Sequence, residues 1–138
     1  MSPETEIAAD GLTIVEIDMR PDAAYYPEVA VIALKRGLPR ATERSVLTEE
    51  LVHHRLGHVG EVTEAEWARQ ELRAHREAAK WLIPLDRLAE AIAASTCWHD
   101  VAAHLDVDTF YLERRIMDLS PEESRTLRRT LGRLELDL

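Results

Sequence analysis

Apolar and polar residues alternate in two segments near the start of the chain, and this period of two predicts β-strands. Residues 12–19 (LTIVEIDM) alternate and are rich in β-branched side chains, as is typical of a half-buried strand. Residues 28–34 (EVAVIAL) form a second apolar strand, and the turn signal KRGLP at 35–39 follows it. Residues 1–11 are expected to be a flexible lead-in, and residues 25–27 a turn between the strands.

Beyond residue 40 the apolar residues recur at helical spacing, and capping signals divide this part of the chain into helices. The first predicted helix spans residues 42–54, with Thr42 as its N-cap. The second spans residues 63–82 and starts with Thr63 as N-cap and Glu66 three residues later. Further helices are expected over residues 85–94, 99–105 and 109–117, and from the cap Ser120 to about residue 135.

Strands followed by helices predict an α+β fold. The chain has 138 residues, 46% hydrophobic and 31% charged, which favours a compact core with a solvated surface. The formal net charge of −9 argues against broad binding to nucleic acid, because that binding depends on Lys and Arg. The single cysteine, Cys97, can form no internal disulfide, which indicates a reducing, cytoplasmic setting. We expect Cys97 to be a small buried residue, and no apolar run approaches the length of a membrane span.

The segment EELVHH at residues 49–54 points most directly to chemistry. Glu49 and His53 are four residues apart and Glu50 and His53 three, so all three share one face of a helix. In the His-Glu-x-x-His zinc motif the two histidines bind the ion and the glutamate activates water. Here Glu49 replaces the first histidine, and a carboxylate oxygen is also a zinc ligand. The segment predicts a metal site in which Glu49 and His53 are ligands and Glu50 is the catalytic residue.

Residues 44–58 (RSVLTEELVHHRLGH) resemble the metal-binding helix of the ImmA/IrrE family of metallopeptidase-like proteins. Glu50 falls on the family's catalytic glutamate and His53 on its second zinc-binding histidine, while Glu49 matches a Glu-Glu variant of phage-type members. Residues 71–84 (ELRAHREAAKWLIP) resemble the family's downstream helix, which closes on a proline. The resemblance implies a zincin-like fold with a small N-terminal β-sheet and a bound zinc ion.

The family's downstream helix supplies an acidic third ligand, but the corresponding position here holds Arg73. Glu71 is the nearest acidic residue, yet two positions along a helix turn a side chain by about 200°. His75 follows Glu71 by four residues and shares its face. Glu71 and His75 are therefore a candidate pair of substitute ligands beside Glu49 and His53.

His54 and His58 are also four residues apart and form a rival pair of candidate ligands. The alternative is that they face solvent or support the ligands from behind. Both interpretations stay open on the sequence.

Residues 1–84 are expected to form the peptidase-like core and residues 85–138 a C-terminal helical annex. Residues 100–116 have a helix-turn-helix cadence, although the second helix carries few side chains suited to reading DNA. Packing on the core or binding to a protein partner is therefore favoured. The expected apolar core of the annex comprises Val101, Leu105, Val107, Phe110, Leu112 and Ile116, with Trp81 and Trp98 also packed inside. The best candidates for a nucleic-acid contact are four arginines of the last helix, Arg125, Arg128, Arg129 and Arg133.

Members of the ImmA/IrrE family commonly inactivate a helix-turn-helix repressor by cleavage, in mobile elements or stress responses. The resemblance implies a zinc-metallopeptidase-like regulator of phage or mobile-element origin that acts on such a repressor, away from membranes. Two alternatives stay open: a non-catalytic protein of the same fold that binds the repressor, and a small DNA-binding regulator that uses the C-terminal helices. Whether the protein is an active metallo-endopeptidase depends on how complete the metal site is.

Overall fold

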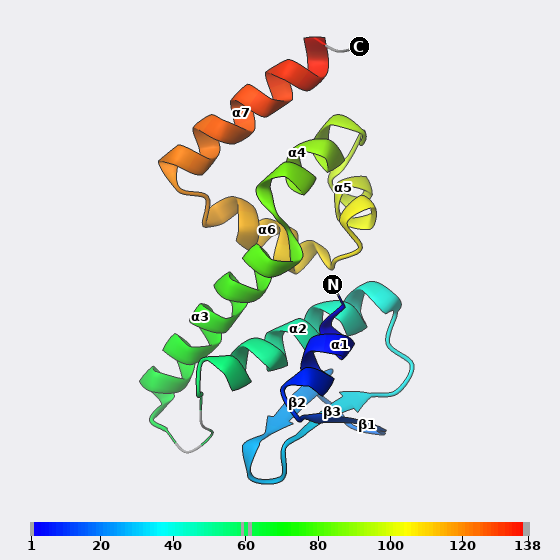
Figure 1. Cartoon of the computed structure of the whole chain (residues 1–138), viewed down its shortest axis with the longest axis vertical. Helices are drawn as coiled ribbons and strands as arrows, with labels where there is room; N and C mark the ends of the chain where they lie inside the picture. The colour runs from blue at the N-terminus through cyan, green and yellow to red at the C-terminus, as the bar shows by residue number, and fades with distance from the viewer. Residues whose placement is uncertain (1, 59, 61, 137–138) are drawn as a thin grey trace.

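A small β-sheet with its covering helices forms one part of the molecule, and a group of short helices forms the other (Figure 1). The computed structural model describes residues 2–58, 60 and 62–136. The strands are β1 (Thr13–Ile17), β2 (Ala23–Tyr26) and β3 (Val31–Lys35). The helices are α1 (Pro3–Ala9), α2 (Arg40–Arg55), α3 (Glu64–Leu82), α4 (Leu85–Ala93), α5 (Trp98–Leu105), α6 (Thr109–Met117) and α7 (Pro121–Leu136). The predicted α+β class is confirmed.

The sheet has the order β1-β3-β2, in which β1 runs parallel to β3 and β2 antiparallel to it. Two strands were expected, and they form at nearly the predicted places. The expectation of a turn at residues 25–27 is wrong for Tyr25 and Tyr26, which belong to the edge strand β2. Proline removes a ladder donor, so Pro21 and Pro27 restrict this strand to four residues. Within the part of the chain that the structure describes, no strand pairs with the side of β2 that faces away from β3.

The expectation of a flexible lead-in at residues 1–11 is wrong, because α1 forms there. Ser2 caps this helix, since its Oγ accepts from the backbone N–H of Thr5 at 3.3 Å. Ile7 is buried in the core between the sheet and the helices. Arg55 at the end of α2 donates to two carboxylates of the segment, those of Glu6 and Asp10. Burial and these ion pairs fix a stretch that has no strong helical pattern of its own.

Two apolar clusters stabilise the fold. The first lies between the sheet, α1 and α2 and contains Ile7, Leu12, Ile32, Leu34, Leu47 and Leu51. The second begins at Ala78 of α3 and extends through α4 to α7, with Leu82, Leu88, Leu105 and Leu112 at its centre. The second half of α3 is therefore built into the helical part of the molecule.

Three residues expected inside the helical part lie at its surface. Cys97 is exposed where the chain enters α5, and Trp98 and Phe110 keep 41% and 45% of their surface accessible. Adjacent residues on a helix point about 100° apart, so α6 can bury only one of its two neighbouring aromatic rings. It buries Tyr111, which is 3% exposed, in place of Phe110.

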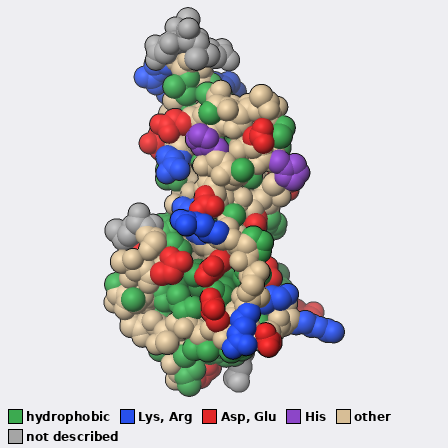
Figure 2. Space-filling view, turned by 90° about the vertical axis from the view of Figure 1, so that its right-hand side faces the viewer, with side chains coloured by type: hydrophobic (Ala, Val, Ile, Leu, Met, Phe, Trp, Pro, Cys, Tyr) green, Lys and Arg blue, Asp and Glu red, His purple; other side chains and the backbone are tan. Residues whose placement is uncertain are grey.

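The surface is charged, as the composition predicts. Figure 2 shows acidic and basic side chains interspersed over one face of both parts of the molecule. No helix among the described residues is long and apolar enough to span a bilayer.

Candidate metal centre

Two neighbouring helices bring the four predicted ligands together. Glu49 and His53 lie one turn apart on α2, and Glu71 and His75 lie one turn apart on α3. Glu49 Oε1 is 2.9 Å from His75 Nε2 and 3.8 Å from His53 Nε2. Glu71 Oε1 is 3.1 Å from His53 Nε2, and its Oε2 is 3.6 Å from His75 Nε2. Each carboxylate therefore contacts both imidazole rings.

Two groups of donors have their ligand atoms within 4.8 Å of one another: Glu49, Glu50 and His53, and Glu49, Glu71 and His75. In a tetrahedral zinc site with bonds of about 2.0–2.1 Å, neighbouring ligand atoms lie about 3.3 Å apart. The four distances here, from 2.9 to 3.8 Å, bracket that separation. Two imidazole nitrogens and two carboxylate oxygens also form a donor set that zinc accepts. The structure thus assembles the predicted ligands, and their binding of a metal stays a prediction.

The charges of the cluster favour a cation between the carboxylates. Burial opposes ionisation of Glu49, but hydrogen bonds from His53, His75 and Tyr111 outweigh it and lower the pKa of Glu49 to about 2. Burial also opposes protonation of His53, yet its hydrogen bonds to Glu49 and Glu71 raise the pKa of His53 to about 9. The carboxylates thus favour a positive charge on His53 in the absence of a metal. A bound divalent ion would supply that positive charge in place of the proton.

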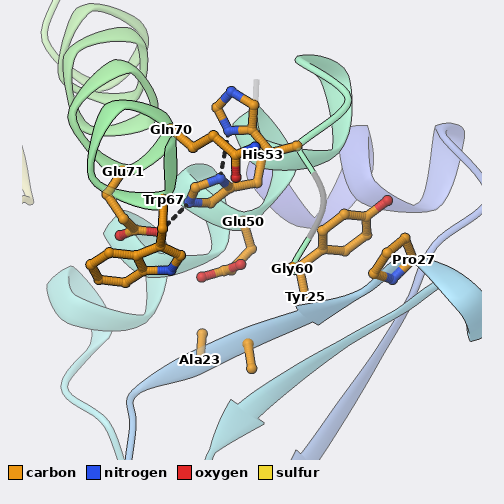
Figure 3. Close-up of a pocket in the computed structure, with 11 residues that line it drawn as sticks. Ala23, Tyr25, Pro27, Glu50, His53, Gly60, Trp67, Gln70 and Glu71 are labelled. Carbon is orange, nitrogen blue, oxygen red and sulfur yellow. Dashed lines mark hydrogen bonds and ion pairs between the residues drawn. The ribbon is translucent and has the colours of Figure 1, made fainter. Parts of the chain in front are cut away.

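Glu50 lies beside the ligands and faces open space. Its carboxyl group lines two cavities of about 240 and 490 Å³, which also share Ala23, Trp67 and Glu71. In Figure 3 this carboxyl group projects beneath His53, between Trp67 and the strand β2. Burial, reinforced by the like charges of Glu49 and Glu71, raises the pKa of Glu50 to about 7. A carboxyl group with that pKa can accept and release a proton near neutrality.

The cleft around Glu50 has a strand on one side and a helix on the other. Ala23, Ala24 and Tyr25 of β2 line the smaller cavity, opposite Trp67 of α3. Because β2 is an edge strand, its free backbone groups are available to a further extended chain. The cleft therefore combines an unpaired strand edge with a carboxyl group suited to proton transfer.

His58 supports His53 from behind. Gly57, with φ of +70°, ends α2 in a Schellman motif, closed by hydrogen bonds from the Gly57 N–H to the His54 carbonyl (3.1 Å) and from the His58 N–H to the His53 carbonyl (3.0 Å). This turn brings His58 Nδ1 to 2.8 Å from His53 Nδ1. His53 Nε2 can then face a metal while its Nδ1–H donates to His58, a common arrangement for a metal-binding histidine.

His54 faces the opposite direction. Its Nδ1 lies 2.7 Å from the hydroxyl of Tyr25, and its Nε2 lies 3.7 Å from a carboxylate oxygen of Asp10. His54 and His58 therefore have different partners and do not form the rival ligand pair. Among the described residues, neither belongs to a group of side chains that could hold a metal ion.

Arg73, at the position where the resemblance places a third ligand, is exposed on α3. The side chains that reach the site from this helix are those of Glu71 and His75. That Glu71 and His75 take the place of the third ligand stays a prediction.

Sequence reasoning missed Tyr111. Its hydroxyl donates to Glu49 Oε2, which links α6 to the metal centre. Burial and the neighbouring Glu49 carboxylate raise the pKa of Tyr111, so the hydroxyl stays a donor. The sequence signal that could have identified Tyr111 was the chemistry of tyrosine, whose buried hydroxyl needs an acceptor.

Thr42, expected as the N-cap of α2, is not the cap, because the helix begins at Arg40. Its hydroxyl instead donates to Asp108 at the start of α6 at 2.8 Å.

The family model of the IrrE N-terminal-like domain (Peptidase_M78) matches residues 10–117. This region runs from the start of the sheet to the end of α6 and contains every site residue described above. None of the curated proteins matches the chain.

Proposed function

Because the chain belongs to the IrrE N-terminal-like domain family of zincin-like metallopeptidases, we propose that it is a metal-dependent endopeptidase with Glu50 as its general base. The observation that carries the proposal is the position of the Glu50 carboxyl group. It opens into a cleft, and Glu50 itself belongs with Glu49 and His53 to one of two neighbouring groups of metal donors, the other being Glu49, Glu71 and His75.

Zinc is the metal that the donor set suits, held by Glu49, His53, Glu71 and His75. A catalytic zinc keeps one position open for water or substrate. Glu71 is the donor best placed to give way, because its side chain is the most exposed of the four at 27% and lines both cavities. We therefore propose that Glu71 is the ligand that gives way to water or substrate.

Glu50 would move the proton that peptide hydrolysis requires. A zinc ion in this site supplies a Lewis acid that polarises the peptide carbonyl and makes a water molecule more acidic. Glu50 accepts a proton from the attacking water and passes it to the amine nitrogen as the C–N bond breaks. Its pKa of about 7 suits both halves of this transfer.

The substrate would lie along β2 as an added strand. The free edge of Ala23–Tyr26 offers backbone hydrogen bonds to an extended peptide, a mode that recognises the main chain more than a particular side chain. Trp67 and Phe110, exposed at the rim, add apolar contact surface. This arrangement supports a preference for flexible, extended segments over folded ones.

A helix-turn-helix repressor is the target that the family resemblance favours. The proposed role is that of a regulator in a phage or other mobile element, which acts in the cytoplasm on an extended segment of the repressor. A reducing compartment suits Cys97, an exposed free thiol.

A second candidate is a non-catalytic protein of the same fold that binds the repressor. The observation in its favour is that four protein donors converge, since zinc sites closed by four protein ligands are typically structural. The DNA-binding alternative has less support. The four arginines expected to contact nucleic acid are exposed on α7, namely Arg125, Arg128, Arg129 and Arg133, but the net charge of −9 disfavours binding to a phosphate backbone.

The comparison of wild type with Glu50→Gln tests the proposal. Each protein is loaded with zinc, its metal content is measured, and its cleavage of a library of unstructured peptides is followed by mass spectrometry. We expect zinc in both proteins and cleavage by wild type alone. Glu90→Gln, at an exposed position of α4, is the matched control and should cleave as wild type does.

The outcomes separate the two candidates. Zinc in both proteins without cleavage of the peptides, or of a repressor encoded beside the gene, would favour the non-catalytic candidate. Wild type that takes up no zinc would contradict the metal-dependent proposal altogether.

A further inference from the structure

The two oxygens of Glu49 have different surroundings. Oε1 faces the imidazoles of His75 and His53, at 2.9 and 3.8 Å. Oε2 accepts a hydrogen bond from the hydroxyl of Tyr111. The donor lies on α6, 62 positions further along the chain. One oxygen is thus directed to the metal centre while the other is held from outside it.

A carboxylate that replaces a histidine brings an ambiguity that the histidine lacks. An imidazole directs one nitrogen at the ion, whereas a carboxylate can bind through one oxygen or through both. Binding through both would raise the coordination number and use the position that a catalytic metal keeps open. A hydrogen bond that occupies the outer oxygen removes this ambiguity.

We propose that Tyr111 is a positioning residue that makes Glu49 bind the metal through Oε1 alone, so that the Glu49–Tyr111 pair replaces the first histidine of the zinc motif. This inference rests on the metal site of the proposed function. It also assigns a role to the C-terminal helices, because α6 supplies the Tyr111 hydroxyl that orients the Glu49 carboxylate.

The packing around Tyr111 fixes its hydroxyl in place. The ring is 3% exposed and has edge-to-face contacts with Phe110 and His75, with centroid distances of 5.0 and 6.4 Å. Asp108, three residues before it, accepts from Thr42 of α2 at 2.8 Å. The start of α6 is thus tied to the same helix that carries Glu49, which limits how far the hydroxyl can move from the carboxylate.

Tyr111→Phe removes the hydroxyl and keeps the ring. Loss of such an outer partner typically weakens metal binding by about 10- to 100-fold, and we expect a loss in this range for zinc, measured by competition with a chromophoric chelator. Tyr25→Phe is the matched control, because it also removes a tyrosine hydroxyl that is hydrogen-bonded inside the protein. The partner of that hydroxyl is His54, which is not a proposed ligand. Tyr25→Phe should bind zinc as tightly as wild type.

Cobalt(II) gives a signature that a purely structural role would not produce. With Oε2 released, Glu49 can bind through both oxygens, so the visible absorption bands of the Tyr111→Phe protein should weaken as the coordination number rises. Wild type and Glu49→His should instead share the stronger bands of a low coordination number. This second comparison tests whether Glu49 binds through one oxygen even if Tyr111→Phe does not fold; weaker bands in wild type than in Glu49→His would contradict the inference.

A double-mutant cycle completes the test. In the Glu49→Ala background there is no carboxylate to hold, so Tyr111→Phe should change zinc affinity by less than about 3-fold. An equal loss in both backgrounds, or unchanged zinc affinity and cobalt spectrum in Tyr111→Phe, would overturn the inference and leave the proposed function standing. Wild type that binds neither metal would overturn both.

Discussion

The end of α2 supplies a prediction whose size follows directly from the structure. Gly57 has φ of +70°, in the left-handed region that residues with a Cβ atom rarely adopt. A Cβ atom at this position would meet no heavy atom of the described residues within 4 Å. The cost of Gly57→Ala is therefore conformational, with no clash added, and amounts to about 1 kcal/mol of unfolding free energy.

Gly132 is the matched control, because the same substitution there should have the opposite sign. It lies within α7, where a glycine destabilises a helix by about 0.5–1 kcal/mol relative to alanine. A Cβ atom at Gly132 also meets nothing within 4 Å. Gly132→Ala should therefore stabilise the protein by about the amount that Gly57→Ala destabilises it.

Urea denaturation followed by circular dichroism measures both effects, and thermal unfolding should show shifts of about 3–6 °C in opposite directions. Gly57→Asn should lose less stability than Gly57→Ala, since asparagine tolerates the left-handed region better. A Gly57→Ala protein as stable as wild type would refute the reasoning. Gly57→Ala should also weaken zinc binding, because the turn that it strains holds His58 against His53.

Three further predictions concern stability, pH and metal. Arg115→Met leaves the buried Ile83 carbonyl without its donor, and chemical denaturation should show a loss of about 2–3 kcal/mol. A hydrogen bond from Arg55 lowers the pKa of Asp10 below its ordinary value of 3.8. The stability that this contact contributes is therefore present above pH 4 and is lost as the pH falls through the lowered pKa. On acidification below pH 4, the melting temperature of Arg55→Met should fall less than that of wild type. Zinc should raise the melting temperature of wild type but not of His53→Ala, and a chelator should reverse the effect.

The ligand pairs illustrate how far local rules reach. Spacings of four residues place Glu49 with His53, and Glu71 with His75, on the face of whichever helix forms. The capping residue Thr63 and Pro84 define the ends of the second helix, and both signals agree with α3. These features depend on residues within one or two helical turns of each other, so the sequence predicts them well.

Contacts between distant segments are where the predictions fail. β2 forms because it pairs with β3, and its four residues carry no alternating pattern of their own. The α1 segment is ordered by burial of Ile7 and by Arg55, which lies far along the chain. Such elements depend on partners that a local window does not contain.

The sequence alone determined the α+β class, the boundaries of the main helices and the two pairs of candidate ligands, because short-range spacing and capping decide these. Only the tertiary structure decided that the two pairs face each other across α2 and α3. It also decided that α6 turns Tyr111 rather than Phe110 inward, and so gives Glu49 its partner. The physical reason is that a helix fixes the directions of its own side chains, whereas the packing of helices on one another decides which of those directions meet.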